Sequence, residues 1–346
     1  MEKLQEKTIY LYGAGKRGEV ALENLKAFGL EQRVAAFIDD SYWGGVYCGK
    51  PVYSIPEVMN FVNETAVFVI TTYAVNQMVC RLMEKGILCN QICFFPELLI
   101  DNIEEGIFRE NKDKIECVYH MLEDNLSKFV YASLFKIYTD GNIGILSRTK
   151  GDVQYFPIKG NSDEIEGFDL TDEEVFIDCG AYDGDTIKVF KDITNKKYKS
   201  LWAFEPNEAS FKKLSDYIDR EHDVRIRLLK KGAYSDNTKM YFNSDRGSSS
   251  GLNATGEDCI EVCQIDSVVK EPVTFIKMDI EGAERNALRG AKEVISKYKP
   301  KLAICIYHRI EDFWEIPMLI KTLNPDYKIY IRNYEDRIDE TVCYAI

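Results

Sequence analysis

The sequence lacks the signals of several protein classes. No apolar run reaches membrane-spanning length, and Met1 to Glu6 does not have the composition of a signal peptide. The ten cysteines include no C-x-x-C pair, and the pairs spaced four apart, Cys89/Cys93 and Cys259/Cys263, come without a matching His or Cys cluster. These absences argue against a membrane span and a zinc site. They favour unpaired thiols in a cytoplasmic protein.

Basic residues are outnumbered by acidic ones. Lys and Arg number 44 against 57 Asp and Glu, which gives a net charge of −13. An acidic chain is poorly suited to the phosphate backbone of nucleic acids, so a nucleic-acid partner is not expected. The 346 residues, 45% of them hydrophobic, exceed one small core and suit two domains.

Residues 175–207 have the pattern of a ligand-binding strand, loop and helix. An apolar run, Val175 to Ile177, predicts a buried strand, and Gly180 and Gly184 follow in a turn where backbone can approach a ligand closely. A second apolar run leads to Glu205, twenty-five residues after Gly180. An acid at this position can accept hydrogen bonds from both hydroxyls of a ribose.

The charge of this loop distinguishes between two nucleotide cofactors. Residues 178–185 include the three acids Asp178, Asp183 and Asp185. They would repel the pyrophosphate of NAD but tolerate the zwitterionic, sulfonium-bearing S-adenosylmethionine. The stretch is therefore predicted to bind S-adenosylmethionine, the alternative being an ordinary strand–turn–helix. The predicted cofactor-binding residues are Asp178, Gly180, Tyr182, Asp185, Thr186, Glu205, Asn207, Gly232 and Ala233.

A second glycine loop lies near the start of the chain. The apolar run Thr8 to Tyr12 leads into a G-x-G-x-x-G sequence, and the next run, Val34 to Ile38, ends in an acid at the spacing of a ribose-binding residue. This part resembles the nucleotide-sugar-binding domains that precede bacterial sugar acetyltransferases and some sugar dehydratases. Nucleotide-sugar binding, NAD binding and a packing module without a ligand all stay open. The residues that would contact a ligand are Gly13, Gly15, Lys16, Arg17, Gly18 and Asp39.

These patterns predict an α/β chain in three parts. Residues 1–98 form a small Rossmann-like domain, residues 99–138 a helical connector, and residues 139–346 a second Rossmann-like domain. Apolar residues at helical spacing, such as Val118 and Leu122, define the connector. They would form a core, a lid over the substrate or the contact of a homodimer, and His120 among them is expected to be structural.

Three blocks in the second domain are distinctive when taken together. They are FIDCGAYDGDT from Phe176, FEPN from Phe204 and IKMDIEGAERNALRGA from Ile276, followed by an apolar run and His308. With this spacing, residues 140–346 resemble the FkbM family of S-adenosylmethionine-dependent methyltransferases. Tyr182 departs from the resemblance, because many members carry a small or amide side chain there.

The resemblance implies a fold and a reaction. The fold is a class I methyltransferase sheet, whose antiparallel C-terminal strand pair would be Tyr327–Ile331 and Thr341–Tyr344. The reaction is O-methylation, often of sugars or other hydroxylated bacterial and natural-product substrates.

Methyl transfer to a hydroxyl also needs a group that takes the proton. Asp178, Glu205, Asp279 and His308 follow predicted strands, so they are expected to face one crevice at the carboxyl edge of the sheet. Asp279 or His308 is the predicted base, and His308 has the more suitable ordinary pKa. Alternatively, Asp279, Glu281 and His308 hold a divalent cation, or the acids only support the helix that follows.

The predicted function is thus an O-methyltransferase acting on a hydroxyl of a saccharide or nucleotide-linked sugar. One alternative is an NAD-dependent oxidoreductase acting on a nucleotide sugar through the N-terminal domain. The chain lacks its helical Tyr-x-x-x-Lys pair, because Tyr12 and Lys16 lie in the glycine loop and Tyr155 and Lys159 straddle Pro157. A non-catalytic binding protein is the other alternative. The expected partner is a small-molecule or glycan substrate.

Overall fold

A computed structural model describes residues 4–72, 75–93, 106–140, 146, 149–242, 258–335 and 338–346. The chain divides into two compact units, Met1–Lys112 with Phe129–Arg148, and Asp113–Lys128 with Thr149–Ile346. Each unit therefore contains part of the predicted helical connector, of which residues 99–105 lie outside the described residues. The predicted boundaries at 98/99 and 138/139 stay a prediction.

The N-terminal unit is built on a six-stranded sheet with the order β3-β4-β2-β1-β5-β6. β1 pairs in parallel with β2 and β5, while β3 and β4 form a short antiparallel pair. Its elements are β1 (Thr8–Tyr12), α1 (Lys16–Ala27), η2 (Glu31–Arg33), β2 (Val34–Ile38), β3 (Val46–Tyr47), β4 (Lys50–Tyr53), α2 (Ile55–Val58), β5 (Ala66–Ile70), α3 (Val75–Glu84), η3 (Cys89–Gln91), β6 (Ile92–Cys93) and α4 (Ile107–Glu110). Ile9, Leu11, Leu25 and Phe37 are in its core.

Two helices of the predicted connector follow: α5 (Lys112–Met121) and α6 (Asn125–Asp140). In the described residues, no helix is both long and apolar enough to cross a membrane.

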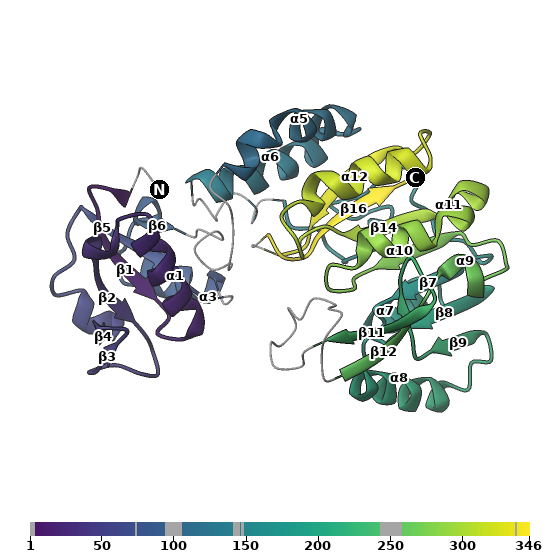
Figure 1. Cartoon of the computed structure of the whole chain (residues 1–346), viewed down its shortest axis with the longest axis horizontal. Helices are drawn as coiled ribbons and strands as arrows, with labels where there is room; N and C mark the ends of the chain where they lie inside the picture. Colours follow the sequence, from purple (N-terminus) through teal and green to yellow (C-terminus); the bar gives the residue numbers. More distant parts are fainter. Residues whose placement is uncertain are drawn as a thin grey trace. The chain divides into compact units, whose positions relative to one another are not determined.

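The C-terminal unit is built on a seven-stranded sheet with the order β15-β16-β14-β13-β7-β8-β9. Its elements are β7 (Val175–Cys179), α7 (Asp185–Ile193), β8 (Ser200–Phe204), α8 (Glu208–Glu221), β9 (Ile226–Leu229), β10 (Gly232–Ala233), β11 (Thr238–Phe242), β12 (Asp258–Cys263), α9 (Ile265–Val268), β13 (Phe275–Met278), α10 (Glu284–Gly290), α11 (Lys292–Tyr298), β14 (Lys301–Cys305), α12 (Asp312–Leu323), β15 (Ile329–Asn333) and β16 (Thr341–Ala345). Helices α10, α11 and α12 pack against one another (Figure 1).

The strand order confirms the predicted fold class. β9, β8, β7, β13 and β14 run parallel, and every residue of β7 and β13 is buried, which explains why these runs are apolar rather than alternating. β16 pairs antiparallel with both β14 and β15 and so forms the expected C-terminal pair. A separate three-stranded sheet, β10-β12-β11, was not expected from the sequence.

Aromatic side chains from the central strands, from helix α7 and from the segment before β7 pack against one another. The ring of Phe176 on β7 stacks on Phe275 of β13, with centroids 4.7 Å apart, and lies 4.7 Å from the ring of Phe190 on α7. Phe156 packs beside the same three rings. Because Phe176 is the second residue of β7 and Phe275 the first residue of β13, this part of the core lies near the amino ends of the two strands.

Replacing Phe176 by Ala is expected to destabilise the protein strongly. The substitution removes a fully buried ring and leaves a cavity among three other rings, which lowers the free energy of unfolding by about 3–5 kcal/mol. Val224→Ala is the control: this side chain is 95% exposed, so its change should stay within about 0.5 kcal/mol. Urea denaturation measures both, and similar values for the two variants would contradict the packing argument.

Candidate active site

A cavity of about 680 Å³ lies at the carboxyl edge of the seven-stranded sheet. The loops after β7, β8 and β13 wall it, as do β10, β12 and the segment 153–156. Its size falls in the range of small-molecule sites, and its position, beyond the strand ends of an open α/β sheet, is where such sheets bind ligands.

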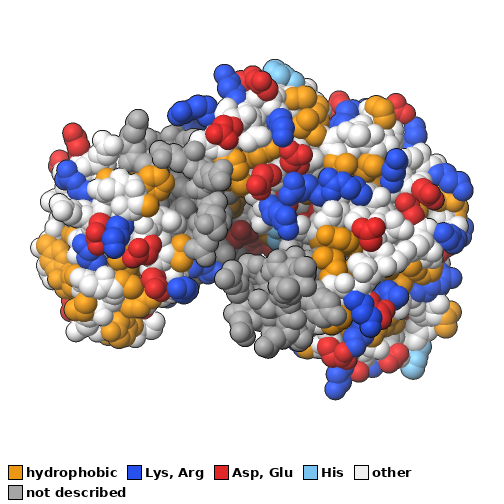
Figure 2. Space-filling model, viewed as in Figure 1, with side chains coloured by type: hydrophobic (Ala, Val, Ile, Leu, Met, Phe, Trp, Pro, Cys, Tyr) orange, Lys and Arg blue, Asp and Glu red, His pale blue; other side chains and the backbone are white. Residues whose placement is uncertain are grey.

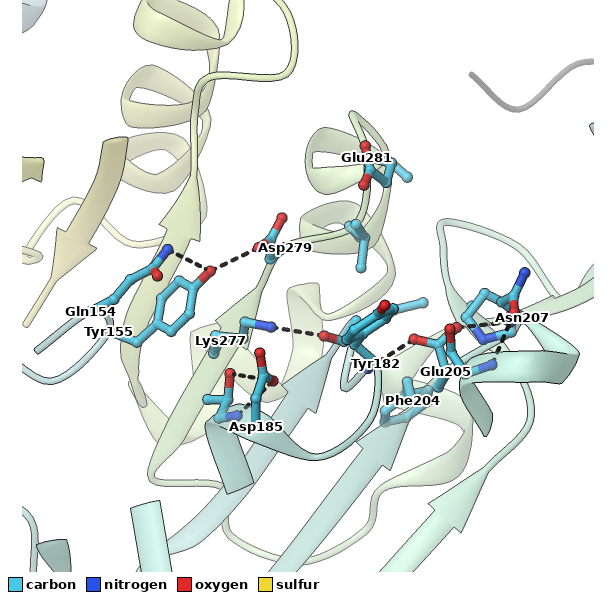
Figure 3. Close-up of a pocket in the computed structure, with 18 of the residues that line it drawn as sticks. Gln154, Tyr155, Tyr182, Asp185, Phe204, Glu205, Asn207, Lys277, Asp279 and Glu281 are labelled. Atoms are coloured by element: carbon cyan, nitrogen blue, oxygen red, sulfur yellow. Dashed lines mark hydrogen bonds between the residues drawn. The ribbon is translucent and has the colours of Figure 1, made fainter. Parts of the chain in front are cut away.

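Glu205 directly follows β8, and its side chain connects two loops. Its Oε2 accepts a hydrogen bond from the backbone N–H of Tyr182 at 2.9 Å, and its Oε1 accepts one from Asn207 at 2.8 Å (Figure 3). Burial nevertheless raises the pKa of this carboxyl, although the two N–H groups oppose the shift. Each oxygen retains a second lone pair, so the carboxylate can still accept two hydroxyl groups from a ligand.

The glycine loop after β7 lies against the loop after β13. Gly180 has φ +79°, and a Cβ atom there would lie 1.8 Å from the carbonyl oxygen of Asp279. Only glycine fits this position, for both conformational and steric reasons. Asn207 begins α8, and its side chain accepts hydrogen bonds from Ala209 and Ser210 at 3.0 Å.

A buried ion pair lies below the glycine loop. Asp178 on β7 is fully buried, and its Oδ1 is 3.1 Å from the ammonium of Lys277 on β13. Lys277 also donates a hydrogen bond to the carbonyl oxygen of Gly180 at 2.8 Å. Burial opposes the charge on Lys277, but the carboxylates of Asp178 and Asp279 outweigh it and raise its pKa. The pair therefore holds the loop to the sheet from below.

Asp279 is the centre of a hydrogen-bonded network in the opposite wall. Its Oδ2 accepts a hydrogen bond from the hydroxyl of Tyr155 at 2.7 Å, and Tyr155 in turn accepts one from Gln154 (Figure 3). Its Oδ1 accepts a bond from Tyr307 at 3.3 Å. Burial favours the neutral acid, but Lys277, His308 and these hydroxyls outweigh it and lower the pKa of Asp279. Asp279 is therefore ionised at neutral pH.

His308 lies behind Asp279, between two carboxylates. Its Nε2 is 3.3 Å from Oδ1 of Asp279, and its Nδ1 is 3.0 Å from Oε1 of the fully buried Glu284. Burial disfavours the imidazolium, but the hydrogen bond and charge of Glu284, with the charges of Asp279 and Glu281, raise the pKa of His308 to about 9. A ring with both nitrogens protonated can donate to both acids.

Three possible metal ligands lie close together, and they differ from the predicted set by one residue. Asp279, Glu284 and His308 each offer one ligand atom, and these atoms lie within 4.8 Å of one another, whereas the predicted set contained Glu281 in place of Glu284. Glu281 lies on the cavity side, with Oε2 3.7 Å from Nε2 of His308. The donors suit a divalent cation, but a protonated His308 already supplies a positive charge to the same carboxylates.

The structure brings most of the predicted site residues to the cavity wall. Those that line it are Gly180, Tyr182, Asp185, Thr186, Glu205, Asn207, Gly232, Ala233, Asp279 and Glu281. Of those predicted in the C-terminal unit, two do not line it: Asp178 lies beneath the loop, and His308 contacts the wall residues Asp279 and Glu281 from behind.

The polar wall residues that the sequence reasoning missed include Gln154, Tyr155, Lys277 and Glu340. Lys277 left a signal, as the single charged residue in an apolar run. The other three are in loops and left none.

Sequence and structure comparisons agree with this geometry. Residues 178–338 match a family described as "Methyltransferase FkbM domain". This part of the chain is an FkbM methyltransferase domain. The match covers the glycine loop, Glu205, Asp279 and His308, so the recognised resemblance is confirmed, and the C-terminal unit is that of a methyltransferase.

A solved FkbM methyltransferase structure shares this fold. The crystal structure of methyltransferase FkbM from Methylobacillus flagellatus KT matches with a TM-score of 0.73 and 22% identity, over 99% of this chain and 90% of that one. An identity this low shows the shared fold alone. An rRNA methylase from Streptococcus thermophilus has a TM-score of 0.33 and 16% identity, over 51% of this chain and 87% of that one.

Fibrillarin from Aeropyrum pernix, solved with natively bound S-adenosyl-L-methionine, has a TM-score of 0.33 and 11% identity, over 51% of this chain and 69% of that one. This likeness and that of the rRNA methylase are too weak to support an argument. No curated protein matches the chain.

The glycine loop of the N-terminal unit has a similar local arrangement. Asp39 follows β2, and its Oδ2 accepts a hydrogen bond from the backbone N–H of Ala14 at 2.9 Å. A Cβ atom on Gly18 would lie 2.1 Å from the carbonyl oxygen of Gly13. Lys16 forms an exposed ion pair with Glu19. The other predicted contacts, Gly15 and Arg17, lie at the start of α1. Ligand binding at this loop stays a prediction.

Raising the pH is expected to remove the stabilisation that the FkbM domain gains from the His308 imidazolium. Its folded pKa of about 9 lies above the ordinary 6.5, so this stabilisation is complete below about pH 6.5 and is lost as the pH rises through about 9. Between these values, the free energy of unfolding should fall more for the wild type than for His308→Gln. Urea denaturation at each pH measures this.

His120→Gln is the matched control, because this histidine is exposed on α5. It should follow the wild-type pH dependence. Parallel curves for the wild type and His308→Gln would show that the folded protein does not hold the proton on His308.

Proposed function

We propose that the chain is an S-adenosylmethionine-dependent O-methyltransferase that acts on a saccharide hydroxyl. The observation that supports it best is the pairing of Glu205 with the Gly180 loop in one cavity, opposite a wall of hydrogen-bonding groups centred on Asp279. A nucleotide-linked sugar is the second form of acceptor, with the N-terminal glycine loop as its recruiting element.

The cavity residues fit this cofactor. The carboxylate of Glu205 would hold the ribose hydroxyls, Gly180 and Asp185 the methionine portion, and Gly232 and Ala233 the adenine. The fit rests on the free lone pairs of Glu205 and on the side-chain-free surface of Gly180, which lets a ligand approach the backbone. When bound, S-adenosylmethionine would supply an activated methyl group, whose carbon is attacked by the acceptor oxygen while S-adenosylhomocysteine leaves with the electron pair of the broken C–S bond.

Asp279 is the proposed base for the acceptor hydroxyl. It lines the cavity and is ionised at neutral pH, whereas His308 does not line the cavity and already holds a proton. His308 then acts as a positioning residue: its imidazolium fixes Asp279 from behind, and the hydroxyls of Tyr155 and Tyr307 fix it from the sides. A divalent cation held by Asp279, Glu284 and His308 is the alternative.

Glu205→Gln is expected to weaken binding of the demethylated cofactor, S-adenosylhomocysteine, about 10- to 100-fold, because a charged acceptor of two hydroxyl groups is lost. Isothermal titration calorimetry measures the dissociation constant. Glu208→Gln is the control, since Glu208 lies on α8 and forms an exposed pair with Lys230. Equal affinities for wild type and Glu205→Gln would contradict the cofactor assignment.

Asp279→Asn is expected to reduce the rate of methyl transfer about 100-fold or more while S-adenosylhomocysteine still binds, because the amide cannot take a proton. The rate is followed as S-adenosylhomocysteine released in the presence of a panel of saccharides. Magnesium and EDTA should leave the wild-type rate unchanged. A rate that requires magnesium would replace the base by a metal site, and methylation of none of the saccharides would contradict the proposed acceptor.

A further inference from the structure

The cavity wall contains an unusual share of constrained backbone. Nine non-glycine residues of the described chain have positive φ, and four of them line this cavity: Tyr155 at 68°, Tyr182 at 46°, Glu281 at 55° and Glu340 at 61°. Each such residue costs of the order of 1 kcal/mol or more, and such strain gathers at functional sites. Two of the four are acids, Glu281 and Glu340, so the backbone is in an unfavourable conformation where these carboxylates face the cavity.

Among the described residues, neither of these two acids forms an ion pair with a Lys or Arg side chain. Glu340 interacts with the neutral amide of Gln154, and the nearest cation to Glu281 is His308, 3.7 Å away and already between two other acids. Both side chains line the cavity, and burial together with the charge of Asp279 raises the pKa of Glu340. Both carboxylates would therefore gain from a positive ligand group.

The other charged residues of the cavity cannot supply a positive charge to Glu281 and Glu340. Lys277 is the only Lys or Arg among the described wall residues, and it is bound to Asp178 and Gly180. Glu205 and Asp185 lie on the side that we assign to the cofactor. Asp279, Glu281 and Glu340, together with Gln154 and Tyr155, are left to face the acceptor. On the outer face of the C-terminal unit, in contrast, positive and negative side chains are interspersed (Figure 2).

We propose that Glu281 and Glu340 select an acceptor that carries a protonated amine, namely an amino sugar or amino-cyclitol, and this inference rests on the proposed function. The ammonium group lies between the two carboxylates and donates hydrogen bonds to both. A neighbouring hydroxyl of the same molecule then faces Asp279. Uronates are rejected, because their carboxylate would meet the carboxylates of Glu281 and Glu340 in a desolvated wall.

Isothermal titration calorimetry tests the selection in three steps at neutral pH. S-adenosylhomocysteine is titrated first, so that failure of the cofactor site appears on its own. The saturated protein is then titrated with glucosamine, galactosamine and mannosamine. Finally, it is titrated with their N-acetylated forms, the parent hexoses and glucuronate.

At least one amine should bind about tenfold more tightly than its N-acetylated and parent forms, since hydrogen bonds to charged groups contribute about this much. Glu340→Gln should bring that ratio close to one. Glu335→Gln, which removes an acid on the same turn that pairs with Lys150, should leave it unchanged.

Three results would overturn the proposal. The first is that S-adenosylhomocysteine binds while no amine has an advantage over its neutral counterparts. The second is tighter binding of glucuronate than of the amines. The third is that magnesium gives glucose the affinity of glucosamine, because the acids would then hold a metal ion rather than an amine.

Discussion

The whole cavity depends on one buried cation. Lys277 stands in an otherwise apolar central strand, and its ammonium joins three elements: Asp178 of the neighbouring strand, the carbonyl of Gly180 in the cofactor loop, and the ring of Tyr155, 5.0 Å away. Leaving either partner of such a pair alone in the core costs several kcal/mol, so the pair is kept or lost as a unit. The positions of the glycine loop and of the tyrosine that bonds Asp279 are therefore set by the same charge.

Much of this fold could be inferred from the sequence, because its information is local. β7, β8 and β13 are short apolar runs that end in acids or glycines, and parallel strands buried on both faces must have this composition. The spacing of Gly180 and Glu205 reflects one strand, one helix and a second strand, a distance fixed by backbone geometry. The C-terminal pair could be recognised for the same reason, as two short apolar runs with a turn between them.

The cavity wall around Asp279 could not be inferred, because the residues that form it are far apart in the sequence and come together only in the fold. Tyr155 and Asp279 are separated by 124 residues, and Glu340 and Gln154 by 186. The ordinary pKa of histidine suggested that His308 is a base, but that pKa belongs to a ring surrounded by solvent. The carboxylates of Glu284, Asp279 and Glu281, all from the segment that follows β13, change this environment, and the proton stays on the imidazole. Spacing along the chain contains neither kind of information.

The two glycine loops show why a local motif does not determine function. In both units an acid at the end of the second strand accepts a backbone N–H from the loop, Ala14 to Asp39 and Tyr182 to Glu205. The units differ in the strand on the other side of the loop. After β5, Thr71 donates its hydroxyl to carbonyls of the loop itself, whereas after β13 Asp279 presents a carboxylate to a cavity. A nucleoside site needs only the shared half of this arrangement, whereas the proton acceptor that we propose for methyl transfer, Asp279, follows the strand that the motif does not include.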